Sequence, residues 1–346
     1  MRLSVLDLVP IRTDQTTADA VAASVGLART ADRLGFTRLW VAEHHNMPSV
    51  AATSPPVLVA HLAAATERIR VGSGGVMLPN HAPLAVAEQF ALLEAAHPGR
   101  IDLGLGRAPG SDPVTSMALR GAAGRDDTDV QNFPQYLDDV VALMGRDGVR
   151  VPIPRQHYVL KATPHAASEP AVWLLGSSMY SAQLAAAKGL PYVFAHHFAG
   201  RGTAEALAHY RANFVPSDLA SEPVTLLTVN AVVAEDHDEA LALALPNLQS
   251  MARLRTGLPL SALDLVEDAE KAELPDAARA MVDAGLARPA IGTPAEAAAQ
   301  VRELAETFGV DEVMLHPVAS ARQGVDPRTS PARERTLELL AAELLD

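Results

Sequence analysis

The sequence predicts an α/β fold, a TIM-type (β/α)8 barrel with insertions in its βα-loops. Three observations lead to this prediction. Eight short apolar runs with strand character alternate with longer runs of helical periodicity. The length of 346 residues suits one barrel with insertions. Hydrophobic residues make up 49% of the chain but aromatic residues only 4%, a composition that suits helices packed on a sheet.

The first half of the chain contains four strand candidates, at Leu3–Leu8, Arg38–Ala42, Ile69–Leu78 and Ile101–Leu105. Helical segments follow them, from Thr17 to a terminating Gly35, at Val57–Thr66, at Ala82–Ala96 and near Tyr136–Met144. Each strand is therefore expected to be followed by a helix that returns the chain to the start of the next parallel strand.

The second half repeats the alternation, with strand candidates at Ala171–Leu175, Tyr192–Ala195, Val224–Val233 and Glu312–His316. Helices are expected at Ser178–Lys188, Thr203–Phe214, Ala295–Phe308 and from about Ala332 to Leu345. Thr293-Pro294 provides the start signal for the third of these helices. A doubly wound open sheet is the alternative architecture, but no G-x-G-x-x-G opens a first helix.

Two segments exceed the simple repeat, at approximately 107–170 and 235–292. The first is rich in turn residues; the second is acidic and helical, with expected breaks at Leu245-Pro246 and Leu258-Pro259. Both are interpreted as insertions in βα-loops, which lie over the active-site end of a barrel. Nothing divides the chain further, so residues 1–346 are expected to form a single domain.

Composition excludes several classes of function. The formal net charge is −13, which argues against a nucleic-acid or anionic-membrane partner. The absence of cysteine excludes disulfides, thiolate metal sites, iron–sulfur clusters and cysteine nucleophiles. The N-terminal apolar run is short and lacks a signal-peptide cleavage site, so a cytoplasmic protein is expected.

The clearest polar cluster is Glu43-His44-His45-Asn46, directly after the second strand. In a barrel this position lies at the catalytic end, and imidazole and carboxylate groups can transfer protons near neutral pH. The competing interpretation is helix capping or a loop hydrogen bond. Adjacent residues of an extended chain point to opposite faces, so His44 and His45 would not readily share an ion, and no metal site is predicted.

Glycines and an arginine mark two neighbouring strand ends. Gly74-Gly75 lies inside the third strand, where glycine indicates either close approach of a flat ring or a bulge required by barrel packing. Arg107 follows the fourth strand among small residues and could reach an anion. The alternative for Arg107 is a surface residue in a turn.

Two further strand ends carry polar residues. Gly176-Ser177-Ser178, with Ser181, joins the fifth strand to a helix and could present free N–H groups and hydroxyls to a phosphate, or form an ordinary N-cap. Together with Arg107, this turn could hold one phosphate monoester. His196 and His197 follow the sixth strand and either line the pocket or bond loop backbone.

These residues resemble the bacterial luciferase-like, flavin-dependent monooxygenase superfamily, in the branch of single-gene luciferase-like oxidoreductases. The resemblance is carried by WVAEHHN (40–46), IRVGSGGVMLPNHAPLAVAEQF (69–90), PGRIDLGLGRAPG (98–110) and WLLGSSMYSAQLAAAKGLPYVFAHHF (173–198), and extends over nearly the whole chain. It implies a TIM barrel that takes reduced FMN from a separate reductase and uses O2 to oxidise a small organic substrate.

The resemblance also implies roles for single residues. His44 corresponds to a histidine needed for the flavin chemistry, with Glu43 beside it. Gly74-Gly75 corresponds to a non-prolyl cis peptide under the flavin ring. Arg107, Gly176 and the serines 177, 178 and 181 correspond to positions that hold the FMN phosphate. His45, His196 and His197 are assigned to the substrate pocket.

Other functions remain open from the sequence. One is hydride transfer with a deazaflavin cofactor, and another is a flavin-binding barrel without catalysis. The resemblance also implies a homodimer, to which the apolar segment Ser54–His61 could contribute. The segment 235–292 could be a lid that excludes water. No motif identifies the substrate.

Overall fold

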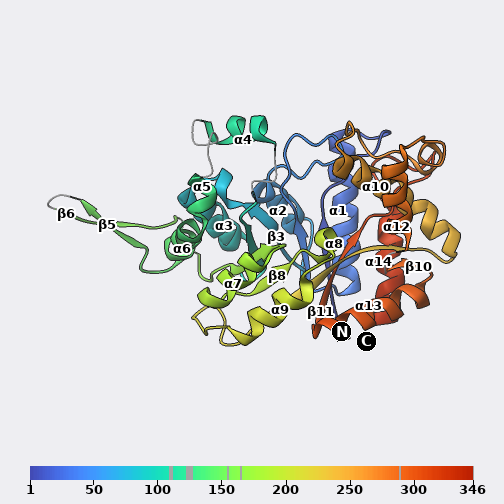
Figure 1. Cartoon of the computed structure of the whole chain (residues 1–346). Helices are drawn as coiled ribbons and strands as arrows, with labels where there is room; N and C mark the ends of the chain where they lie inside the picture. The colour runs from blue at the N-terminus through green and yellow to red at the C-terminus, as the bar shows by residue number, and fades with distance from the viewer. Residues whose placement is uncertain (109–111, 122–127, 154–155, 164–165, 288–289, 346) are drawn as a thin grey trace.

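The structure is a computed structural model, and it describes residues 1–108, 112–121, 128–153, 156–163, 166–287 and 290–345. Parts of the predicted insertion at 107–170 lie outside the described residues. Within the described residues, eight parallel strands close into a barrel (Figure 1). In order around the barrel they are β1 (Arg2–Asp7), β2 (Arg38–Val41), β3 (Arg70–Met77), β4 (Ile101–Gly106), β7 (Ala171–Gly176), β8 (Tyr192–Phe194), β9 (Thr225–Val233) and β11 (Glu312–Pro317).

Closure of the sheet decides between the two predicted architectures. β9 pairs in parallel with both β8 and β11, and β11 pairs with β1, so the order returns to its starting strand. An open doubly wound sheet would leave two unpaired edges. The barrel prediction is therefore confirmed, and each of the eight predicted strands overlaps one observed strand.

Helices surround the barrel, one after each strand: α1 (Thr17–Leu34), α2 (Pro55–Ala64), α3 (Pro83–Ala96), α6 (Phe133–Met144), α7 (Met179–Lys188), α9 (Thr203–Ala212), α13 (Pro294–Phe308) and α14 (Pro331–Leu344). Their ends follow local sequence signals. A capping box between Thr16 and Asp19 begins α1, and Gly35 ends it in a left-handed conformation at φ 84°. A second capping box, between Thr293 and Glu296, begins α13 as the sequence predicts.

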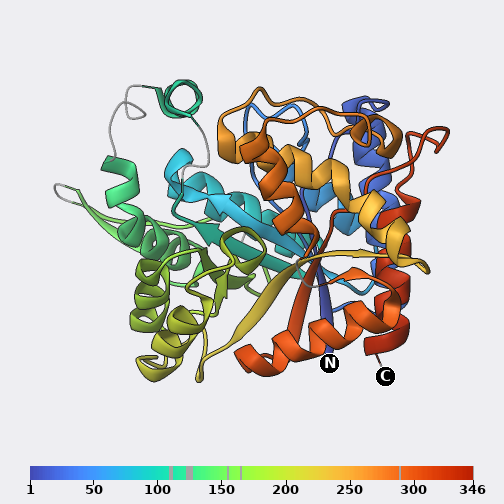
Figure 2. The same cartoon turned by 45° about the vertical axis from the view of Figure 1, so that its right-hand side comes forward.

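The two long connections contain the remaining elements. Between β4 and β7 lie α4 (Pro113–Arg120), α5 (Thr128–Gln131) and an antiparallel hairpin of β5 (Val149–Ile153) and β6 (Gln156–Leu160). The sequence did not predict this hairpin, which extends away from the barrel in Figures 1 and 2. Between β9 and β11 lie α10 (His237–Thr256), α11 (Val266–Ala269), α12 (Asp276–Leu286) and β10 (Ile291–Gly292).

The predicted helix break at Leu245-Pro246 is wrong, because Pro246 lies inside the continuous helix α10. Packing against α12 and α11, together with the buried position of Pro246, supports the helix across the proline. The break at Leu258-Pro259 is confirmed: α10 ends at Thr256, and Gly257 adopts φ 71°.

The barrel interior is layered. Its middle layer is apolar, formed by Leu6, Trp40, Trp173, Val193, Leu226 and Met314. The rings of Trp40 and Trp173 meet edge to face, with centroids 5.4 Å apart. These two indoles fill a volume that smaller side chains would leave empty, so the barrel is packed rather than hollow at this level.

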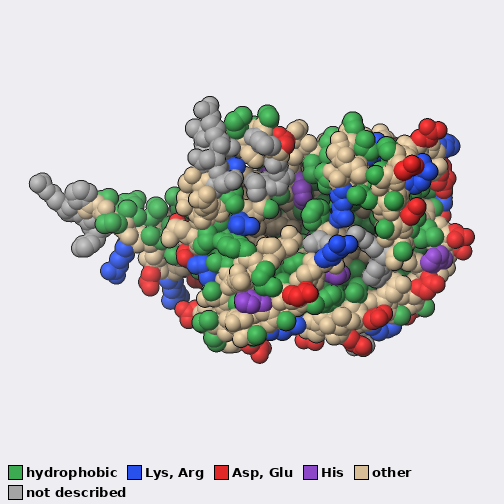
Figure 3. All heavy atoms as spheres, viewed as in Figure 1, with side chains coloured by type: hydrophobic (Ala, Val, Ile, Leu, Met, Phe, Trp, Pro, Cys, Tyr) green, Lys and Arg blue, Asp and Glu red, His purple; other side chains and the backbone are tan. Residues whose placement is uncertain are grey.

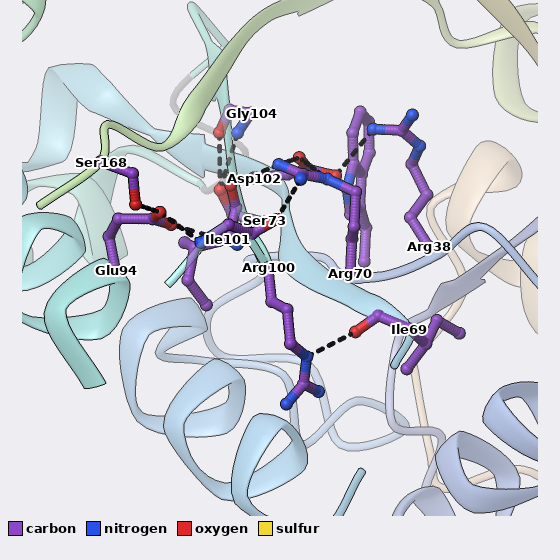
Figure 4. Close-up of polar contacts among 12 residues, drawn as sticks. Arg38, Ile69, Arg70, Ser73, Glu94, Arg100, Ile101, Asp102, Gly104 and Ser168 are labelled. Atoms are coloured by element: carbon purple, nitrogen blue, oxygen red, sulfur yellow. Dashed lines mark hydrogen bonds and ion pairs between the residues drawn. The ribbon is translucent and has the colours of Figure 1, made fainter. Parts of the chain in front are cut away.

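A buried ionic layer closes the amino-terminal end of the barrel (Figure 4). The Arg38 guanidinium bonds Asp102 at 2.8 Å and Glu312 at 2.7 Å, and it stacks on Trp173 at 4.8 Å. Arg70 donates two hydrogen bonds to Asp102 Oδ1. Because every charge here has an opposite partner, the protein tolerates the burial of these charges. A functional site is therefore expected at the other end of the strands.

That opposite end is covered by the long connections. Figures 1 and 2 both place α4 and α10 at one end of the molecule, while the two chain termini lie at the other. β1 starts at Arg2, so the termini mark the amino-terminal end of the barrel and α4 and α10 lie beyond its carboxyl end. Among the described residues, no helix is long and apolar enough to cross a membrane.

Candidate active site

Glu43 holds the turn after β2 to the end of β3. It is buried, with 1% of its surface exposed, and its Oε1 lies 2.8 Å from Nε2 of both His45 and His81. Its Oε2 accepts a hydrogen bond from the Met77 N–H at 2.9 Å. Burial alone would raise the pKa of Glu43, but the bonds from His81, His45 and Met77 outweigh it and lower that pKa. Glu43 is therefore a charged anchor for the predicted cluster.

His44 differs from His45 because no side chain among the described residues forms a hydrogen bond with its ring. Its backbone N–H bonds the Ala52 carbonyl at 2.8 Å, which fixes the turn. Among the described residues, its buried Nδ1 has no hydrogen-bond partner. Burial lowers the pKa of His44, with Glu43 acting in the opposite direction. A neutral imidazole with an unused nitrogen is suited to exchange a proton with a bound molecule.

A second group of histidines lies at the same end of the barrel, near His44. The rings of His197 and His316 are 5.8 Å apart, edge to face. Nδ1 of His197 lies 2.8 Å from the Thr228 hydroxyl, and Nδ1 of His316 lies 2.9 Å from Asn230 Oδ1. Both His197 and His316 are influenced electrostatically by His44, so the three rings form one cluster.

The histidine cluster is uncharged at neutral pH. Burial, and then the neighbouring His196 and His44, lower the pKa of His197 to about 4. Burial also lowers the pKa of His316 well below its ordinary value. Neutral rings accept as well as donate hydrogen bonds, so this cluster can receive a donor group from a ligand.

Sequence reasoning placed His45 and His197 correctly at the carboxyl end of the strands, but it missed His81, Asn230 and His316. Met314 on β11 points into the barrel, and His316, two residues further along, points the same way near the end of the strand. The rule that identified His44, a polar side chain at a carboxyl strand end, would also have found His316. His196 lies apart from the pair: its Nδ1 is 2.8 Å from the Thr203 hydroxyl, and its ring packs against Phe308.

The peptide bond between Gly74 and Gly75 is cis, as the resemblance implies. The packing of the barrel also requires glycine here. A Cβ on Gly74 would lie 3.0 Å from Trp40 Cβ, and one on Gly75 would lie 2.8 Å from the Gly104 carbonyl oxygen. The strand register shifts between Ser73 and Val76, so the packing and bulge interpretation of these glycines is supported.

The predicted phosphate residues meet where β4 and β7 end. The Arg107 guanidinium lies 4.2 Å from the centre of the Tyr180 ring, in the first turn of α7. Ser177 is exposed, and Ser178 is the N-cap of α7 without a side-chain capping bond. Among the described residues, this arrangement brings a cation and two hydroxyls to a helix N-terminus, which attracts an anion.

Ser181 has a different environment from Ser177 and Ser178. It is buried, donates to the Ser178 carbonyl at 2.7 Å and lies 3.0 Å from the Tyr192 hydroxyl. A Cβ on Gly176 would come within 2.3 Å of its Oγ. Ser181 therefore supports the turn from beneath, and glycine at 176 leaves the space for it.

The space-filling view in Figure 3 is hollowed near the middle of the face, and histidine side chains lie at the edge of the hollow. Helix α10 reaches the segment after β8 that carries His197, since Arg255 donates to the Phe198 carbonyl at 2.7 Å. Among the described residues, no group of three or more His, Asp or Glu side chains is arranged to hold a metal ion.

Comparison with known proteins identifies the family of the chain. The family model described as luciferase-like monooxygenase matches residues 1–312. The chain belongs to the luciferase-like monooxygenase family. A protein of Escherichia coli (strain K12) named luciferase-like monooxygenase is 45% identical over 254 residues, 73% of each chain. N-acetyl-S-alkylcysteine monooxygenase of Bacillus subtilis (strain 168) is 40% identical over 200 residues, 58% of each chain.

Solved structures of other proteins share the barrel. The structure of apo-MsnO8 is 33% identical in sequence and superposes with a TM-score of 0.85. The alignment covers 99% of this chain and 98% of apo-MsnO8. Two more distant structures resemble this one in fold, at 16% and 14% identity, TM-scores of 0.68 and 0.62 and coverage of 98% or more of each chain. They are the oxygenating constituent of 3,6-diketocamphane monooxygenase in complex with FMN and an F420-dependent secondary alcohol dehydrogenase with an F420–acetone adduct.

Proposed function

We propose that this family member is an FMN-dependent monooxygenase that uses reduced flavin and O2 to oxidise a small organic substrate. The observation that carries the proposal is the neutral, buried His44 imidazole with an unused Nδ1, at the end of the barrel where the anion-attracting turn also lies. A proton-exchanging group and a phosphate-binding turn at the same end are what a bound flavin nucleotide requires.

The residues present fit FMN. Arg107, Ser177 and Ser178 would hold its phosphate, with Gly176 and Ser181 shaping the turn. Gly74-Gly75, near the end of β3, would lie beside the ring system, although barrel packing also accounts for glycine at both positions. When bound, reduced FMN supplies the electrons that activate O2. Among the titratable groups described above, His44 is the one placed to exchange a proton, and Glu43 fixes the turn that carries it.

His45 is a less suitable pocket residue than His44 or His197, because its Nε2 is engaged by Glu43. His197 and His316 present neutral rings, held by Thr228 and Asn230, to a substrate. The helices α10–α12 provide cover against water, which would otherwise compete for the activated oxygen. In this proposal the segment 235–292 forms a lid over the active site.

A homodimer is the proposed assembly. Val57 on α2 is 67% exposed and Leu92 on α3 is 57% exposed, and the two helices pack against each other. Exposed apolar side chains on adjacent helices favour association with a second apolar surface. The segment Ser54–His61 contributes the α2 part of this surface.

The experiment that tests the function combines binding and oxygen transfer. The purified chain is titrated with FMN and with a deazaflavin, and flavin fluorescence reports the affinity. With FMN, a flavin reductase, NADH and ¹⁸O2, we expect one labelled oxygen atom in an oxidised product from a panel of thioethers, ketones and alkenes. Hydride transfer with the deazaflavin but no labelled product would favour the alternative function, and FMN binding without either reaction would favour flavin storage.

A further inference from the structure

Arg120 is a buried cation with two guanidinium nitrogens that find no hydrogen-bond partner among the described residues. Its side chain is only 5% exposed although it lies at the end of the surface helix α4. Nε and Nη1 are buried and, among the described residues, have no hydrogen-bond partner. Since guanidinium N–H groups can only donate hydrogen bonds, these two nitrogens leave an unmet demand for an acceptor.

Among the described residues, the anion that pairs with Arg120 does not satisfy this demand. Asp129 Oδ2 lies 3.6 Å from Nη1 of Arg120, beyond hydrogen-bond distance, and Asp129 Oδ1 accepts a hydrogen bond from the Tyr136 hydroxyl at 2.8 Å. The buried guanidinium groups of Arg12, Arg38 and Arg333 all donate hydrogen bonds. Arg38, for comparison, donates three hydrogen bonds to two carboxylates.

The polarity of α4 is reversed relative to an ordinary surface helix. Its apolar side chains Val114, Met117 and Leu119 are exposed, whereas Ser116 is buried and the side chain of Arg120 is turned inward. Ser116 and Arg120 are four residues apart and therefore share one face of the helix. The inner face of α4 thus presents polar groups to the protein, where a surface helix normally presents apolar ones.

That inner face lies at the rim of the candidate active site. α4 and α5 both pack against the short 3₁₀ helix η1 (Leu78–Asn80). The next residue is His81, whose Nε2 is hydrogen-bonded to Glu43. At its other end, α4 begins at Asp112, whose pKa is lowered by hydrogen bonds, chiefly from Thr115 and to a smaller extent from Asn46. Asn46 belongs to the turn that carries His44, so α4 spans the ends of β2 and β3.

We propose that Arg120 recognises a carboxylate of the substrate, which makes this enzyme selective for small organic acids. This inference rests on the proposed function for its reaction, but the binding site stands on geometry alone. A carboxylate is the acceptor that best matches a guanidinium, and it would use the donors that Asp129 leaves free. The net charge of the chain, −13, does not attract anions in general, so selectivity here must come from a local cation.

The test uses binding rather than turnover. The panel pairs hexanoate, octanoate, benzoate and N-acetylmethionine with their primary carboxamides, and calorimetric titration of the full-length protein is done with and without FMN. We expect at least one acid to bind about tenfold or more tightly than its amide, and Arg120→Gln to abolish that preference. Arg120→Lys, which keeps the charge but not the planar fork, should retain part of it.

Asp129→Asn is the matched variant, because it removes the neighbouring charge and leaves the guanidinium in place. Acid selectivity should be kept or increased in this variant. If Arg120 served only as a structural partner of Asp129, both variants would lose similar stability and neither would change ligand preference. That result, or an acid preference that survives Arg120→Gln, or no acid preference in the unaltered protein, overturns the inference. Loss of FMN binding alone would affect the proposed function and not this site.

Discussion

Asn230 on β9 fixes His316 on β11, since its side-chain oxygen accepts a hydrogen bond from Nδ1 of His316 at 2.9 Å. The Asn230 amide nitrogen simultaneously donates to the His197 carbonyl at 3.1 Å. One amide thus joins two segments that are more than a hundred residues apart in sequence. With Nδ1 of His316 protonated, its Nε2 is left as an acceptor, which orients the cluster near His44.

His44→Ala should remove proton exchange without removing the cofactor site. We expect FMN affinity to change little and turnover to fall about 10²–10⁴-fold, the usual contribution of a positioned acid or base. Flavin absorbance measures FMN binding, and product formation measures turnover. His45→Ala is the control, since Nε2 of His45 is bound to Glu43; an equal loss of turnover in both variants would contradict the assignment to His44.

Arg107→Ala should weaken the binding of the FMN phosphate and leave the binding of the flavin ring unchanged. We expect the FMN dissociation constant to rise by about 10- to 100-fold, as a charge-assisted bond is lost. Riboflavin, which lacks the phosphate, should bind the variant and the unaltered protein equally well. Fluorescence titration with both ligands checks this. A parallel loss of riboflavin affinity would show that Arg107 holds the fold or the Tyr180 ring rather than the phosphate.

Acid should destabilise the protein through its buried histidines. The folded-state pKa of His197 is about 4 against 6.5 for an ordinary histidine, so between these pH values the unfolded chain binds more protons. The contribution of His197 to the free energy of unfolding is therefore fully present above about pH 6.5 and is lost as the pH falls towards 4. This loss is on the order of 3 kcal/mol. His197→Gln should flatten the dependence measured by urea unfolding between those values.

His237→Gln provides the contrasting control for that experiment. The pKa of the exposed His237 is raised, first by its hydrogen bond to Glu296. Its contribution is fully present below pH 6.5 and is lost as the pH rises above that value. The variant should therefore leave the slope between pH 4 and 6.5 unchanged, and a change there equal to that of His197→Gln would contradict the explanation.

Gly104→Ala should destabilise the barrel, whereas Gly106→Ala on the same strand should not. A Cβ at Gly104 would approach the Ser73 carbonyl oxygen to 2.2 Å, but at Gly106 the nearest atom is 3.9 Å away. Overpacking of this kind costs about 1–3 kcal/mol. The midpoint of urea unfolding distinguishes the two variants, and equal midpoints would show that β3 and β4 can separate at no cost.

Val57→Glu should convert the proposed dimer to a monomer. A charge at the centre of an apolar interface loses solvation without gaining a partner. Light scattering at micromolar concentration measures the change in mass, and Val114→Glu serves as the control, because Val114 is equally exposed but lies on α4. A monomeric unaltered protein would refute the assembly.

Much of the fold could be predicted from sequence because its causes are local. Alternating apolar periods identified the eight strands, and Gly35 and Thr293 marked helix ends through hydrogen bonds made within a few residues. Pro246 shows the limit of that reasoning. A proline usually ends a helix, and here packing against neighbouring elements overrides the local preference.

The sequence by itself determined the strand ends, and so it placed His44, Arg107 and the serine turn at one rim. Only the tertiary structure decided how their atoms are used. Glu43 became an anchor because His81 and the Met77 N–H reach it from β3 and the turn that follows. Arg120 became a buried cation whose Nε and Nη1 lack a hydrogen-bond acceptor among the described residues, because α4 turns it inward. These outcomes depend on contacts between segments distant in the chain, and neither periodicity nor local hydrogen bonding encodes such contacts.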